Sequence, residues 1–308
     1  MNVRSGRLFS MCVLVLLVLG CGQAVEQKTS QASATGTATA SAGANPTASP
    51  RSGGPRNRPV SRLASARGQG SIKLVYGPTR EAHRREIVKI FREERLFEDV
   101  IADLNAGLVL PRNLEVRFVE CGEVNAFHDP NESAILLCYE LFDHFLNIFS
   151  QGQTGAAADE AGGKAVAALV FVFYHELGHA LIDIYDLPIT GREEDAVDQL
   201  ATVMLLETWE GEDSELAILS SAEWFELDAT EREEDPDLAD EHSLEEQRYY
   251  NLVCWIYGSD PEYFGDVVDD WGLPAGRAER CTSEYERMSN SWGTLLGPHM
   301  RSESGTGP

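Results

Sequence analysis

A short polar motif lies within a strongly apolar segment of this 308-residue chain. His175 and Glu176 are followed by His179, with the apolar runs 166–174 and 180–185 on either side. On a helix, residues four apart share a face, so both imidazoles can bind one zinc ion while Glu176 reaches a water molecule beside it. The alternative, two histidines hydrogen-bonded in a core, leaves the buried glutamate without a role. The motif therefore predicts a metal site on a buried helix.

A third protein ligand is expected from the next helix, because catalytic zinc usually has three protein ligands and one open position. The chain breaks at 187–191, and a new helix is predicted directly afterwards. Glu194 and Asp198 lie four apart on one face of that helix. We predict Glu194 as the third ligand, with Glu193 as the alternative, and Asp198 as a hydrogen-bond acceptor for a ligand histidine. The other interpretation is an acidic first turn that only complements the helix dipole.

These motifs resemble those of the gluzincins, the thermolysin-like peptidases, in which HExxH is followed by a helix carrying ExxxD. Asn125, Ala126 and Phe127, ahead of the strand-like segment 133–138, are similar to the edge strand that holds the substrate backbone in that family. His242 is similar to the histidine that stabilises the oxyanion there. The order of these segments along the chain also agrees. The stretch from about Lys73 to Pro298 is similar to a family of bacterial metallopeptidase domains.

The resemblance implies a zincin-like domain that hydrolyses polypeptides with one zinc ion per chain, held by His175, His179 and Glu194. Glu176 would accept a proton from the zinc-activated water and pass it to the leaving amine. His242 would stabilise the oxyanion, unless it is a surface histidine in an acidic loop. Asn125 and Ala126 would bind the substrate backbone.

Two other functions stay open at this stage. The first is an inactive peptidase-like domain that binds a partner or a cell-wall component through its cleft, although an intact Glu176 argues against it. The second is a zinc amidase acting on cell wall. The backbone-pairing segment at 125–127 favours an extended polypeptide over a cell-wall amide.

The N-terminus predicts export from a bacterial cell. Residues 1–20 combine two arginines with the apolar run 8–19, which is typical of a signal peptide. Residues 18–21 resemble a lipobox, so Cys21 is predicted to carry lipid and to anchor the protein to the cell envelope. A secreted or periplasmic soluble protein is the alternative. The remainder of 21–70 is rich in Ala, Ser, Thr, Gly and Pro and predicts a disordered linker.

Charge excludes one large class of partners. The chain has 50 acidic and 25 basic residues, a net charge of −25, and all but one of the acidic residues follow residue 70. Such a domain is a poor ligand for nucleic acid or for an anionic membrane surface, so we expect membrane contact only through the N-terminal lipid. The acidic stretch 207–246 predicts a solvated loop.

The fold class expected is helix-dominated α+β: a small N-terminal sheet, a central helix with the HExxH motif, and C-terminal helices in one monomeric domain, 71–300, before a disordered tail, 301–308. Besides the lipid-bearing Cys21, four cysteines remain after export, and local pairing is predicted: Cys121 with Cys138, and Cys254 with Cys281. Periodicity predicts strands at 72–76, 114–119 and 133–138, a loop at 151–163, helices at 79–104, 139–149, 164–185, 192–209 and 244–257, and shorter helical pieces near 261 and at 277–288.

Overall fold

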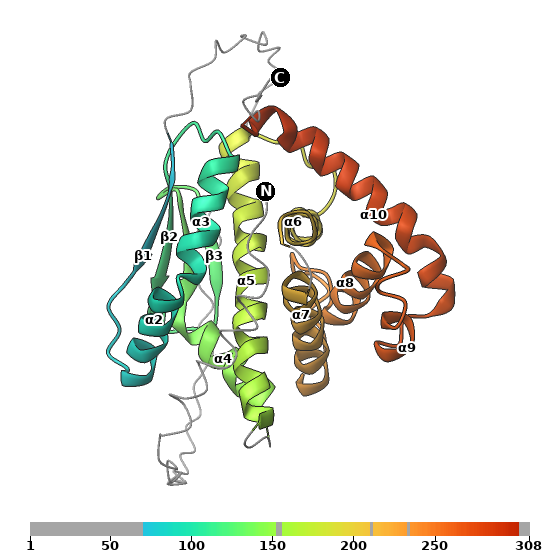
Figure 1. The fold of residues 1–308 in the computed structure, drawn as a ribbon, viewed down its shortest axis with the longest axis horizontal. Coiled ribbons are helices and arrows are strands. Elements are labelled where there is room, and N and C mark those ends of the chain that lie inside the picture. The colour runs from blue at the N-terminus through green and yellow to red at the C-terminus, as the bar shows by residue number, and fades with distance from the viewer. Residues whose placement is uncertain (1–69, 152–155, 210–211, 233–234, 302–308) are drawn as a thin grey trace, which may run out of the picture.

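The computed structural model describes residues 70–151, 156–209, 212–232 and 235–301. The expected signal peptide, Cys21 and its linker, and the tail from residue 302 onward lie outside the described residues. The described part is a helix-dominated α+β structure, which confirms the predicted fold class. Figure 1 shows one long helix running through the middle of the domain, with the sheet on one side and most C-terminal helices on the other.

The sheet has four strands in the order β1-β2-β4-β3. Strand β3 lies at one edge and runs antiparallel to β4, whereas β1, β2 and β4 are parallel. Burial alternates along β2, so one face of the sheet packs on the helices and the other is partly exposed. The strands span β1 Ile72–Tyr76, β2 Leu114–Val119, β3 Ala126–Asp129 and β4 Ala134–Cys138.

The predicted single helix 79–104 is wrong, because the structure has two helices there. Helix α2, Ala82–Glu94, ends at Arg95, whose φ of 56° is left-handed, and α3, Leu96–Gly107, begins directly afterwards. With this break, Phe91 and Phe97 both pack on the ring of Phe118 in β2. Their ring centroids lie 5.8 and 4.9 Å from that of Phe118. Packing on one aromatic ring therefore outweighs the continuity of the helix.

The central helix α5, Ala156–Tyr185, carries the HExxH motif and contacts α4, α6, α7 and strands β3 and β4. It begins eight residues before the predicted start, inside the expected loop 151–163. Among the described residues it is the one helix long and apolar enough to cross a membrane, but 94% of its most apolar window is buried inside the domain. Its hydropathy is thus accounted for by core packing.

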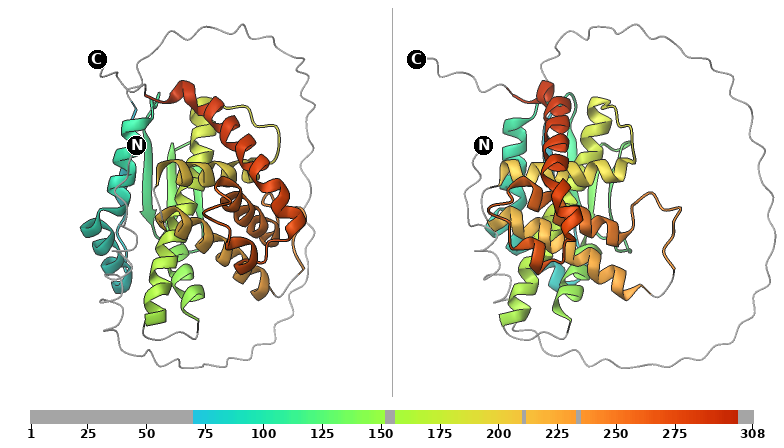
Figure 2. Two further views of the ribbon diagram at one scale, coloured as in Figure 1. Left: turned by 45° about the vertical axis from the view of Figure 1, so that its right-hand side comes forward. Right: turned by 90° about the vertical axis from the view of Figure 1, so that its right-hand side faces the viewer.

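The C-terminal half contains a helix where the sequence predicted an acidic loop. Helix α7, Glu212–Glu231, buries Ala217, Ile218, Ala222 and Phe225 on one face. Its many acidic residues make the helical spacing of these apolar residues hard to recognise in the sequence. Figure 2 shows the C-terminal helices gathered beside α5. The remaining helices are α4 Tyr139–Ser150, α6 Glu193–Thr208, α8 Glu245–Ser259, α9 Val267–Asp270 and α10 Ala275–Leu296, followed by the short η1 Gly297–His299.

Two disulfides join neighbouring elements, in the pairs that local pairing predicts. Cys121 bonds to Cys138 at the end of β4, and Cys254 of α8 bonds to Cys281 of α10. Helices α8 and α10 approach so closely that a Cβ at Gly258 would lie 2.3 Å from the backbone oxygen of Cys281. Disulfides persist in oxidising compartments, so these two bonds indicate an extracellular or periplasmic location.

Candidate metal centre

Three side chains from two crossing helices meet at one point. In α5, His175 and His179 direct their Nε2 atoms at the Oε2 atom of Glu194 in α6, at 3.1 and 3.3 Å. The potential ligand atoms of these residues all lie within 4.8 Å of one another. The helices cross closely because the motif has glycine at 178, where a Cβ would lie 2.8 Å from the side chain of Val197.

The other nitrogen of each imidazole is held by a second carboxylate. His175 Nδ1 lies 2.7 Å from Asp198 Oδ1, and His179 Nδ1 lies 2.8 Å from Glu193 Oε1. A proton on each Nδ1 leaves the Nε2 lone pair free and pointing at the shared centre. Glu193 and Glu194 therefore stand in different places: Glu194 faces both Nε2 atoms, and Glu193 orients His179 from outside.

Arg248 of α8 is a member of the site that the sequence analysis missed. Its Nε and Nη2 atoms donate to both oxygens of Asp198, each at 2.8 Å, and its guanidinium lies 4.0 Å from the centre of the Phe225 ring. Asp198 is buried, and Arg248 is largely shielded from solvent. The available signal was helical spacing, which places Arg248 on the same face as the apolar Leu252 and Trp255.

The electrostatics of the centre favour positive charge beside Glu194. Burial alone would lower the pKa of His175, but the hydrogen bond and charge of Asp198 and the bond to Glu194 raise it to about 9. Burial alone would raise the pKa of Glu194, but hydrogen bonds from His175, His179 and His242 hold it far below its usual range. Glu194 thus draws positive charge to the point where the imidazoles meet. Two imidazoles and a carboxylate form a donor set that fits zinc.

Glu176 is buried beside His175 and lines the cavity next to the centre. Burial raises the pKa of its carboxyl group, and the backbone N–H of His128 in β3, which donates to it, offsets part of that effect. A carboxylate with a raised pKa is a better proton acceptor near neutral pH. Its position and its environment therefore suit a general base.

His242 reaches the same centre from the segment between α7 and α8. Its Nε2 lies 3.1 Å from Glu194 Oε2, and its Nδ1 lies 3.1 Å from Asp240 Oδ1. Its ring stacks toward His175 at a centroid distance of 6.1 Å, yet 41% of the side chain is exposed. Arg192, the residue before α6, donates to its backbone oxygen at 3.0 Å. His242 is thus at the mouth of the centre and not on a remote surface.

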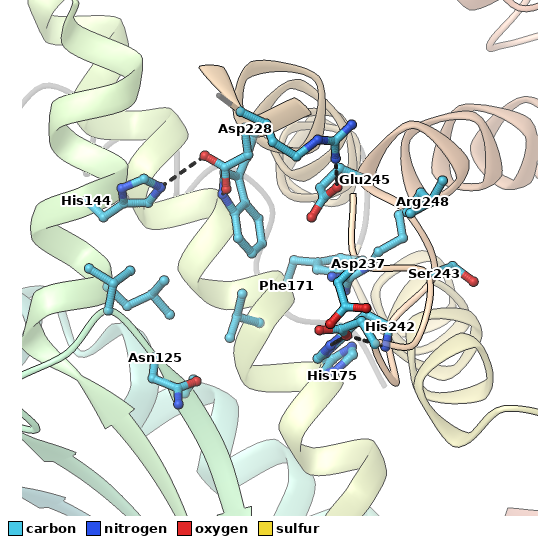
Figure 3. Close-up of a pocket in the computed structure, with 18 of the residues that line it drawn as sticks. Asn125, His144, Phe171, His175, Asp228, Asp237, His242, Ser243, Glu245 and Arg248 are labelled. Carbon is cyan, nitrogen blue, oxygen red and sulfur yellow. Dashed lines mark hydrogen bonds and ion pairs between the residues drawn. The ribbon is translucent and has the colours of Figure 1, made fainter. Parts of the chain in front are cut away.

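A cavity of about 420 Å³ opens from this centre. Asn125 and Ala126, at the start of the edge strand, lie on its lining together with His175, Glu176 and His242. In Figure 3, Asn125 faces His175 and His242 across the open space. The structure therefore brings together the segments that the sequence analysis selected for substrate binding and chemistry.

Residues 76–296, more than half of the chain, match the model of a family described as putative metallopeptidase. The chain belongs to this family. No curated protein and no solved structure matches it. Membership implies a metal ion and a polypeptide substrate.

Proposed function

We propose that this metallopeptidase-family protein is a zinc-dependent peptidase with a zincin-like, thermolysin-like site. The observation that carries the proposal is the meeting of His175, His179 and Glu194 at one point, beside the buried carboxylate of Glu176 and an open cavity. A hydrogen-bonded core would need no such cavity. An enzyme needs a route by which substrate reaches the metal ligands.

His175, His179 and Glu194 would hold one zinc ion per chain. When bound, zinc would polarise the scissile carbonyl and bring the pKa of a water molecule toward neutrality. Asp198 fixes the His175 tautomer, and Arg248 in turn holds Asp198 in place through two hydrogen bonds. The ligands are therefore oriented before the metal arrives.

Two further side chains carry the chemistry. Glu176 accepts the proton of the attacking water and returns it to the leaving amine. His242 donates from Nε2 to the oxyanion, since Asp240 accepts from Nδ1 and keeps the ring turned toward the cavity. Substrate would displace the contact between His242 and Glu194.

The substrate backbone would pair with the edge of the sheet. Strand β3 pairs only with β4 among the described strands, so its outer edge can add an extended peptide as a further strand. Asn125 and Ala126 stand where that edge meets the cavity. This arrangement favours a polypeptide over a cell-wall amide.

The disulfides favour an extracellular or periplasmic location, and the sequence supports a more specific one. We propose that the chain is exported and attached to the cell envelope by lipid on Cys21, with the linker to residue 70 as a tether. We further propose that the catalytic domain, residues 71–300, acts as a monomer.

Metal content and peptide hydrolysis test the proposal together. The purified protein should bind about one equivalent of zinc and cleave members of a mixed peptide library, and a chelator should abolish cleavage until zinc is restored. Glu176→Gln should keep the metal and lose turnover. A protein that binds zinc but cleaves no peptide would fit the inactive binding domain, and cleavage confined to cell-wall amides would fit the amidase.

A further inference from the structure

The cavity continues beyond the metal centre to an end formed by His144, Trp224 and Asp228, here called the Asp228 end. In Figure 3, His144 and Asp228 lie together on the side of the cavity away from His175 and His242. The lining also contains apolar side chains: Leu141 from α4 and Phe171 and Val172 from α5. All three of these side chains belong to the buried core.

Asp228 contacts one imidazole and one indole at this end of the cavity. Its Oδ1 lies 3.3 Å from His144 Nε2, and its Oδ2 accepts a hydrogen bond from Trp224 Nε1. No lysine or arginine of the described ranges forms an ion pair with Asp228. The indole donates a hydrogen bond without removing the charge, and a carboxylate accepts about four such bonds. Asp228 therefore retains acceptor sites.

The two arginines on the cavity wall already have carboxylate partners. Arg232 binds Glu245 and Glu246 at 2.6 and 2.5 Å, and Arg248 binds Asp198. Neither arginine is available to neutralise Asp228 or to receive an acidic substrate side chain. The Asp228 end consequently favours a positive group.

We propose that the Asp228 end is a specificity site for a lysine or arginine side chain of the substrate, next to the scissile bond. The proposal rests on the peptidase function given above. Lysine and arginine have long methylene stems that pack on apolar walls while the cationic head reaches a polar group. Leu141, Phe171 and Val172 form such a wall, and Asp228 is the polar group at its end. A purely apolar side chain would offer Asp228 no positive charge, and an acidic one would be repelled.

The test compares side chains that differ only in charge. Zinc-loaded protein is first given a peptide mixture, and mass spectrometry locates the cleaved bonds. In the best substrate, each residue flanking the cleaved bond is then replaced in turn by lysine, arginine, norleucine and glutamate, and kcat/KM is measured. At one position we expect lysine or arginine to exceed norleucine by about tenfold or more, as for one hydrogen bond between charged groups, with glutamate lowest.

Two variants assign the effect to Asp228. Asp228→Asn should bring the ratio of lysine to norleucine toward one. Glu226→Gln removes the same charge from the same helix, at an exposed residue outside the cavity, and should leave the ratio unchanged. The wild-type ratio should also fall as salt is raised, which needs no variant.

Each contrary result has a separate meaning. Equal cleavage of lysine and norleucine peptides at every flanking position, or an undiminished ratio in Asp228→Asn, would overturn the specificity site while leaving the peptidase intact. A zinc-loaded protein that cleaves none of the peptides would overturn the proposed function, and the specificity site with it.

Discussion

Asp198→Asn is the substitution that tests the support of the metal centre most fully. Asp198 accepts from His175 Nδ1 at 2.7 Å and from two nitrogens of Arg248, each at 2.8 Å. Asparagine has nearly the same shape but only one acceptor oxygen and no charge. The change therefore weakens the orientation of His175 and leaves the Arg248 charge without its partner.

Two magnitudes follow from this geometry. Loss of a group that orients a metal ligand typically costs about 10- to 100-fold in metal affinity. Removing one partner of a buried ion pair costs about 3–5 kcal/mol of folding stability. Water can compensate little for the lost interaction, because only 4% of the Asp198 side chain and 13% of the Arg248 side chain are exposed. Because the asparagine side chain keeps one acceptor oxygen, we expect a stability cost at the lower end of the range of about 3–5 kcal/mol.

A double variant separates the two effects. Asp198→Asn with Arg248→Met removes the unpaired charge and keeps an apolar chain over Phe225, so stability should largely recover. Zinc affinity should stay low, because His175 still lacks its anionic partner. Guanidinium unfolding of the metal-free protein measures the first quantity, and competition with a chromophoric chelator measures the second.

The control removes a charge from the same helix at a residue that does not touch either histidine. Asp195 accepts a hydrogen bond from Ser243 at 2.6 Å, and Asp195→Asn should leave zinc affinity unchanged. Wild-type zinc affinity in Asp198→Asn, or a double variant no more stable than the single one, would refute the reasoning.

Three further outcomes are expected. Glu194→Gln should abolish tight zinc binding in a chelator titration, whereas Glu193→Gln, which only orients His179, should cost about tenfold; the reverse order would exchange their roles. His242→Ala should lower kcat by about 100- to 1000-fold with zinc content and KM little changed, and unchanged steady-state kinetics would exclude it from the chemistry. Burial alone would raise the pKa of Glu140, but bonds from its own N–H, from the backbone of 121–122 and from Arg84 hold it below the usual value. Its stabilisation is present above pH 4.5 and is lost as pH falls through the lower folded pKa, so Glu140→Gln should cost about 1 kcal/mol at pH 7 and progressively less in more acidic urea titrations; a cost independent of pH would contradict this.

Short-range pattern explains which parts of the site could be predicted. The two histidines of the HExxH motif are four residues apart, as are Glu194 and Asp198. On a helix, side chains with this spacing lie on the same face, so the position of one predicts the position of the other. Arg248 could not be assigned in this way, since it meets Asp198 from 50 residues further along the chain. Only the packing of α8 against α6 brings them together.

The errors in the fold have physical causes of the same kind. Helix α7 is acidic at many positions, and its buried face becomes evident only when α5 and α8 pack on it. The break at Arg95 places a non-glycine residue in the left-handed region, for which arginine gives no local signal. The preference comes from Phe91 and Phe97, which share one ring in the core.

A crystal structure of the zinc-loaded protein, with the metal located by anomalous scattering at the zinc edge, tests the central claim most directly. The account predicts one ion at about 2.0–2.2 Å from the Nε2 atoms of His175 and His179 and from a carboxylate oxygen of Glu194, with His242 outside the coordination sphere. Zinc bound elsewhere, or bound with His242 as a ligand in place of Glu194, would contradict it.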